Sequence, residues 1–215
     1  MTGTGRTRKG VRAGVVTTAP ASLILGLALL LAGCGSTTDA AGKGSPTGHN
    51  DADVAFATGM IQHHAQALSM VDLTLGRDLD PKVAKLTEDI RAAQAPEIET
   101  MVDWLQEWDE PIPATVRDHV NSEDHGGGQG AMDEPDTGMD LPGMMSAEDM
   151  AELERASDAA FQDLWLSMMV THHEGAAEMA RTEQADGQYE PAVTLAEDID
   201  RSQTSQIGVM RALRP

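Results

Sequence analysis

Two stretches of the sequence carry the same pattern of metal-ligand side chains, Met-x-x-His-His-x-x-Ala-x-x-Met. On a helix, residues three or four positions apart share a face, so this spacing gathers thioethers and imidazoles on one side. Thioether sulfur and neutral imidazole are soft to borderline ligands, and among first-row ions they suit Cu(I) best. The candidate ligands are Met60, His63, His64 and Met70 in the first stretch and Met169, His172, His173 and Met179 in the second.

The pattern belongs to a longer internal repeat, because residues 54–104 align without a gap with residues 163–213 at a constant offset of 109. The repeat adds Met101 and Met210 to the two candidate ligand sets. It also places Gln94 and Gln203 on the same apolar stripes, where a buried amide needs a hydrogen-bond partner and an imidazole would serve. We therefore expect two equivalent sets, one in each unit, with Gln94 and Gln203 orienting the histidines.

Other interpretations of the same residues stay open. A methionine on an apolar stripe is more often core filler than a ligand, and duplication by itself preserves residues for a time. A ferritin-like di-iron site needs a Glu-x-x-His motif on two helices. Here Met60 stands three residues before His63, and Met169 stands three before His172, which argues against iron chemistry.

The elements that must position these residues are helices. The first unit predicts a helix over 51–75, a turn, and a second helix over 81–108, in which Pro81 suits the first position and Pro96 should cause a kink. In the second unit, Ser146 and Asp149 form a capping pair before helices over 150–184 and 191–213, with a break near Ser157. Two hairpins, 51–108 and 146–215, predict an all-α four-helix bundle.

The segment that joins the hairpins, residues 109–145, is rich in Gly, Pro and acidic residues. Such a segment is poorly suited to burying methionine, so its methionines and histidines are candidates for an accessory copper-collecting arm. The alternative is a plain linker. The residues concerned are His119, His125, Met132, Met139, Met144 and Met145.

The N-terminal part of the chain is typical of an exported lipoprotein. Four basic residues precede an apolar run that is too short to span a membrane, and the run ends in Leu31-Ala32-Gly33-Cys34, which resembles a bacterial lipobox. We expect removal of a signal peptide over 1–33, diacylation of Cys34, and a flexible tether over 34–50. The protein would then be anchored on the extracytoplasmic face of the cell membrane.

Composition excludes some classes of function. The chain has 15 Lys plus Arg against 35 Asp plus Glu, a net charge of −20, which argues against nucleic-acid binding because that needs a basic surface. Aromatic residues make up 3% and methionines number 13, which favours helices over strands. We find no nucleophile with its base, no phosphate-binding loop and no open hard-metal site, and we expect no enzymatic activity.

The strings at residues 56–64 and 165–176 resemble the twin signatures of a bacterial family, the domain-of-unknown-function family numbered 305. The Pro-Gly-Met-Met-Ser string at 142–146 fits it as well, and the resemblance covers about residues 51–214. It implies a ferritin-like four-helix bundle, usually exported, in which some members bind copper through the motif Met and His residues and support copper tolerance.

The sequence therefore predicts a lipid-anchored protein that sequesters Cu(I) or hands it on. Its expected partners are copper ions, the membrane and another copper-handling protein of the envelope. The rival hypotheses are a structural or interaction bundle without metal and, less favoured, a ferritin-like iron oxidase.

Overall fold

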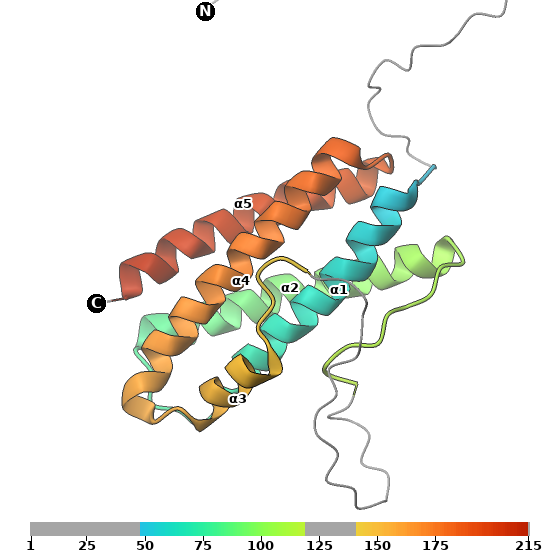
Figure 1. Cartoon of the computed structure of the whole chain (residues 1–215). Coiled ribbons are helices and arrows are strands. Elements are labelled where there is room, and N and C mark those ends of the chain that lie inside the picture. The colour runs from blue at the N-terminus through green and yellow to red at the C-terminus, as the bar shows by residue number, and fades with distance from the viewer. Residues whose placement is uncertain (1–47, 119–140, 215) are drawn as a thin grey trace, which may run out of the picture. The chain divides into compact units, whose positions relative to one another are not determined.

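The computed structural model describes residues 48–118 and 141–214, which form five helices. The long helices pair as hairpins, α1 with α2 and α4 with α5, while α1 also packs on α4 and α2 on α5 (Figure 1). This arrangement confirms the predicted all-α four-helix bundle and adds one short helix, α3. The helices are α1 (Asp51–Asp72), α2 (Pro81–Glu107), α3 (Ala147–Arg155), α4 (Asp158–Asp186) and α5 (Glu190–Leu213). None of these five is long and apolar enough to cross a lipid bilayer.

Polar caps fix where the helices begin. The Asn50 side chain accepts hydrogen bonds from the backbone N–H groups of Ala52 and Asp53, which satisfies two of the four free donors at the start of α1. The capping pair expected before α3 is present, since Ser146 and Asp149 bond each other's backbone N–H. The break near Ser157 is also present, between α3 and α4.

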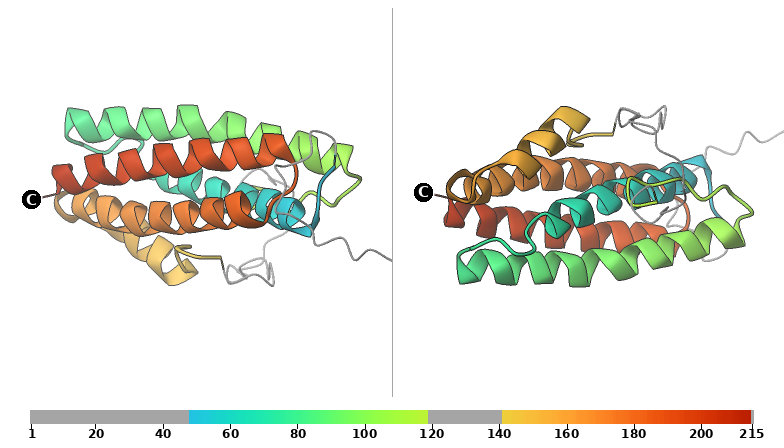
Figure 2. Two further views of the ribbon diagram at one scale, coloured as in Figure 1. Left: turned by 90° about the horizontal axis from the view of Figure 1, so that it is seen from above. Right: turned by 90° about the horizontal axis from the view of Figure 1, so that it is seen from below.

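Helix α2 continues through Pro96, although proline removes one backbone donor from the helix. Met101, which lies beyond the proline, is fully buried. The views from above and from below show α2 running beside α5 (Figure 2). Pro96 therefore does not prevent the second half of α2 from packing on the core.

The core divides into two apolar clusters at opposite ends of the bundle. One, the Trp165 cluster, lies where α1 ends and α4 begins, and the other, the Trp104 cluster, lies where α1 begins and α4 ends. The Trp165 cluster includes Met70, Val83, Leu86, Ile90, Met145, Leu153, Phe161, Trp165, Met168, Met169, Ile207 and Met210. The Trp104 cluster includes Phe56, Met60, Ile61, Met101, Trp104, Leu105, Ala176, Ala180, Ala192, Ala196 and Ile199.

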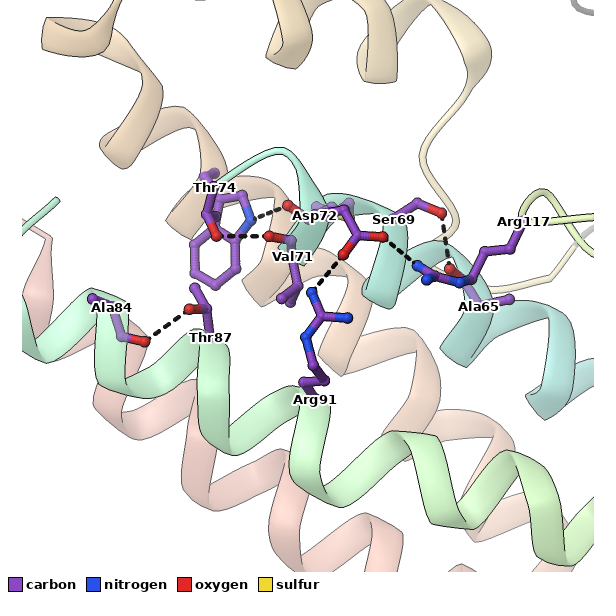
Figure 3. Close-up of polar contacts among 11 residues, drawn as sticks. Ala65, Ser69, Val71, Asp72, Thr74, Ala84, Thr87, Arg91 and Arg117 are labelled. Carbon is purple, nitrogen blue, oxygen red and sulfur yellow. Dashed lines mark hydrogen bonds and ion pairs between the residues drawn. The ribbon is translucent and has the colours of Figure 1, made fainter. Parts of the chain in front are cut away.

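Hydrogen bonds and ion pairs tie the end of α1 to its neighbours (Figure 3). The carboxylate of Asp72 accepts from Arg91 of α2 and from Arg117 of the segment after α2. Partial burial acts to raise the pKa of Asp72, but the two guanidinium groups outweigh it and hold that pKa below its usual range. The indole Nε1 of Trp165 donates to the backbone carbonyl of Met70 at 2.9 Å, linking α4 to α1.

Residues 141–146, here called the strap, run between α4 and α1 before α3 begins (Figure 1). The side-chain amide of Gln66 on α1 both donates to the Met145 carbonyl and accepts from the Met145 N–H, each at 2.7 Å. On α4, a Cβ added to Gly175 would lie 1.9 Å from the carbonyl oxygen of Pro142, so only glycine permits this approach. The strap is therefore fastened to both helices.

Candidate metal centre

The four motif histidines lie in the middle of the bundle, between the two apolar clusters. His63 and His64 come from α1 and His172 and His173 from α4, and all four have no exposed surface. The rings of His63 and His172 are in contact across the α1–α4 interface, with centroids 3.8 Å apart and planes inclined by 44°. The repeat therefore brings its two units together at one central polar layer.

In the first unit, hydrogen bonds define which nitrogen of each ring carries a proton. The Nε2 of His63 lies 3.0 Å from the Pro142 carbonyl of the strap, and the Nε2 of His64 lies 2.7 Å from a carboxylate oxygen of Glu97 on α2. A carbonyl and a carboxylate only accept, so both Nε2 atoms donate and a neutral ring keeps its lone pair on Nδ1. Among the described residues, neither Nδ1 has a hydrogen-bond partner.

In the second unit, both histidines differ from their counterparts in their hydrogen-bond partners. The Nε2 of His173 lies 2.8 Å from the side-chain oxygen of Gln206 on α5. His172 has no hydrogen-bond partner for either ring nitrogen within the described part of the chain. A buried polar group without a partner costs about 1–3 kcal/mol, so the layer as it stands carries unsatisfied ligand atoms.

Burial keeps three of these imidazoles uncharged. Removal from water lowers the pKa of His63 to about 3, reinforced by the neighbouring His64 and partly opposed by the Pro142 carbonyl. For the same main reason the pKa of His172 lies well below its usual value, and that of His173 falls to about 4. A histidine must be neutral to bind a metal, and at neutral pH these three are.

The thioethers form two groups, and each group draws on both hairpins. Met60 and Met101 belong to the Trp104 cluster, and the half-buried Met179 of α4 packs against it. Met169 and Met210 belong to the Trp165 cluster together with Met70 of α1. The repeat offset of 109 relates the groups member by member. We call them the Met60 group (Met60, Met101, Met179) and the Met169 group (Met70, Met169, Met210).

This grouping corrects the expectation that each hairpin gathers its own ligands. Met60 and Met70 are ten residues apart, and a rise of about 1.5 Å per residue separates them by about 15 Å along α1, too far for one ion. The same distance separates Met169 from Met179 along α4. The antiparallel packing of α1 on α4 instead brings the start of one motif near the end of the other.

The structure also gives the histidines different partners from those expected. Gln94 and Gln203 are buried as predicted, but their side-chain oxygens have no hydrogen-bond partner among the described residues. The imidazoles contact Glu97 and Gln206 instead, one helical turn further along α2 and α5. These two residues are also related by the offset of 109, which is the signal that could have found them.

The expected loop ligands are only partly within the described residues. Met145 is buried in the Trp165 cluster and Met144 is half-buried in the strap, so the expectation that this segment leaves its methionines exposed is wrong for Met145. Met145 is buried because the Gln66 side chain holds its backbone with two hydrogen bonds and its side chain packs against the core. His119, His125, Met132 and Met139 lie outside the described residues, as does Cys34.

The donor set distinguishes between classes of metal. In residues 48–118 and 141–214, no three side chains drawn from His, Cys, Asp and Glu are placed to hold an ion. Hard or borderline ions such as iron and zinc need such groups. An ion held in the middle of this bundle would therefore need thioether sulfur as well as imidazole, and that combination favours Cu(I).

Solved structures share this fold. A predicted secreted DUF305 protein from Streptomyces coelicolor is 29% identical, with a TM-score of 0.61 over 75% of this chain and 89% of that chain. A DUF305 fragment from Deinococcus radiodurans is 25% identical, with a TM-score of 0.59 over 76% of this chain and 95% of its own. CopM in its Cu(I)-bound form is 26% identical, with a TM-score of 0.55 over 74% of this chain and 93% of its own.

CopM has also been solved in a Cu(II)-bound form, which is 28% identical to this chain over the same shares, with a TM-score of 0.57. No curated protein matches the chain. The sequence model for the family described as "Domain of unknown function (DUF305)" matches residues 53–214, which include all five helices except the first two residues of α1. The chain with the repeated Met-His-His helices therefore belongs to the DUF305 family.

Proposed function

We propose that this protein binds Cu(I) outside the cytoplasm and holds it or hands it on, without catalysing a reaction. The observation that carries the proposal is the buried layer of four imidazoles, three of them kept neutral by burial, with a group of three thioethers on either side. Its ligand atoms include both nitrogens of His172, which lack a partner in the described residues. The copper-bound forms of CopM, a protein of the same fold, support it.

A purely structural layer is the second interpretation, and the unpartnered nitrogens weigh against it. Hydrogen bonds within a bundle normally satisfy its buried polar atoms. In a purely structural layer, the two unpartnered nitrogens of the His172 ring would lower stability and serve no purpose. A soft cation would use these lone pairs. With neutral ligands the buried site carries the whole charge of the ion, and this favours a singly charged ion over a doubly charged one.

The test is a Cu(I) competition titration of residues 35–215 against a chromophoric chelator, with two triple variants. We expect replacement of the Met60 group by Leu to remove one tight equivalent, and replacement of the Met169 group to remove another. Leu and Met are similar in volume, so each exchange should cost less than about 1.5 kcal/mol of stability. Met150 and Met168, which are not candidate ligands, changed together to Leu are the control and should leave both equivalents. If both test triples bind copper as the control does, the thioethers are core filler and the proposal fails.

We also propose that the protein is anchored through Cys34. The lipobox-like sequence supports this, and the predicted secretion of the Streptomyces coelicolor relative supports export. Changing Cys34 to Ala should move the protein from the membrane fraction to the soluble extracytoplasmic fraction while its helical circular dichroism stays unchanged. Retention of the variant in the membrane fraction would refute the anchor.

A further inference from the structure

The two halves of the polar layer differ in the residue that contacts the second histidine of each pair. Glu97 contacts His64 in the first unit, and Gln206 contacts His173 in the second, each through Nε2 and each 33 residues after its histidine. The repeat offset of 109 joins the two partners as it joins the two histidines. The fold therefore places a carboxylate against one imidazole and an amide of the same shape against the other.

These two partners have different chemistry towards an imidazole. An ionised carboxylate only accepts hydrogen bonds, so Glu97 requires a proton on the Nε2 of His64 and leaves Nδ1 as the ligand atom. An amide can turn either its oxygen or its NH₂ group towards the ring, so Gln206 is compatible with a proton on either nitrogen of His173. Of these two side chains, only the carboxylate fixes the tautomer of its imidazole by itself.

The carboxylate also supplies charge where the candidate ligands do not. Thioethers and neutral imidazoles leave the charge of a buried cation uncompensated, and such a charge is costly in an apolar interior. The Glu97 side chain is 16% exposed and its oxygen lies 2.7 Å from the His64 ring. Carboxylates behind metal-binding histidines raise the basicity of the ligand and typically contribute 10-fold to 100-fold in affinity.

We propose that Glu97 is a positioning residue, which holds His64 with its proton on Nε2 and reserves Nδ1 for the metal, so that the first Cu(I) ion binds on the His64 side. Gln206 is its neutral counterpart on the weaker side. This inference rests on the proposed function for its copper half, while the tautomer of His64 is a property of the metal-free protein.

The first arm of the test uses no copper. Nitrogen-15 NMR of the full chain distinguishes protonated from unprotonated ring nitrogens, and we expect His64 to carry its proton on Nε2 alone. Glu97→Gln should give a mixture of tautomers, and Gln206→Glu should fix His173 as Glu97 fixes His64. Glu99→Gln, which removes an exposed carboxylate from the same helix, is the matched control and should change neither ring. An unchanged His64 tautomer in Glu97→Gln overturns the proposal.

The second arm measures Cu(I) binding in the same variants. Glu97→Gln should weaken the first equivalent about 10-fold to 100-fold. Combining it with Gln206→Glu should restore that affinity and move the first copper-induced NMR shifts from His64 to His173. Equal first affinities in wild type and Glu97→Gln contradict the proposal. A wild-type chain that binds no Cu(I) refutes the proposed function, and the tautomer arm then decides the role of Glu97 independently.

Discussion

The close approach of the strap to α4 makes Gly175→Ala a sharp test of how the polar layer is closed. The added Cβ would meet the carbonyl oxygen of Pro142 at 1.9 Å and its carbonyl carbon at 2.4 Å. Both atoms belong to the backbone, so no side-chain rotation relieves the clash. We expect the strap to move away from α4, which breaks the contact between His63 and Pro142 and strains the two bonds between Gln66 and Met145.

Two effects of opposite sign decide the outcome. Alanine is favoured over glycine inside a helix by about 0.5–1 kcal/mol. Each hydrogen bond lost contributes about 1 kcal/mol net, and a buried group left without a partner costs about 1–3 kcal/mol. With up to three bonds at stake, the loss should exceed the gain, and we expect a net destabilisation of about 2–4 kcal/mol.

The assay is urea unfolding followed by circular dichroism, and α5 offers a matched control. A Cβ added to Gly208 would meet nothing within 4 Å, so Gly208→Ala should show the helix gain alone and stabilise the protein by about 0.5–1 kcal/mol. Opposite signs for the two variants are the expected result. A Gly175→Ala protein as stable as the Gly208→Ala protein would refute the reasoning about the strap.

Three further predictions concern pH and packing. Burial, together with the neighbouring Asp53, raises the pKa of Glu183 from 4.5 to about 9. The stability that Glu183 contributes is therefore complete below pH 4.5 and falls as the pH rises towards 9, by at most about 1.4 kcal/mol per pH unit. In urea unfolding, Glu183→Gln should remove this pH dependence. For His63 the pH dependence of stability has the opposite sign, because its pKa is about 3 in the folded protein and 6.5 in the unfolded chain. The free energy of unfolding should therefore decrease as the pH drops below 6.5, and His63→Gln should reduce this decrease. Trp165→Phe should cost about 1–3 kcal/mol in thermal or urea unfolding, because it leaves the Met70 carbonyl without the indole donor.

The architecture could be predicted from the sequence because its signals are local or repeated. The capping pair at Ser146, the proline at position 81 and the apolar stripes are local features, and all correspond to observed helix starts or buried faces. The constant offset of 109 between the two repeats predicts, from the sequence alone, that the two hairpins are equivalent. The helix predicted over 81–108 includes Pro96, and α2 is continuous through it.

The grouping of the ligands could not be predicted in the same way, because it depends on how the hairpins pack. The motif has the same sequence in either unit, but only the antiparallel contact of α1 with α4 decides that Met70 lies with Met169. The histidine partners were missed for a related reason. Glu97 and Gln206 differ in type, so a search for identities passes over them, although the repeat makes them equivalent.

The asymmetry of the centre arises from the strap, which lies outside the repeat. Gln66 and Gly175 occupy equivalent positions at the offset of 109, and both hold the strap, the first by a pair of hydrogen bonds and the second by having no side chain. The strap thus contacts two equivalent positions of the repeat, Gln66 and Gly175, in different ways. As a result the Pro142 carbonyl reaches His63, while His172 keeps both nitrogens without a partner in the described residues. A duplicated scaffold of this kind would bind two identical ions equally, and the strap together with Glu97 makes its two halves chemically distinct.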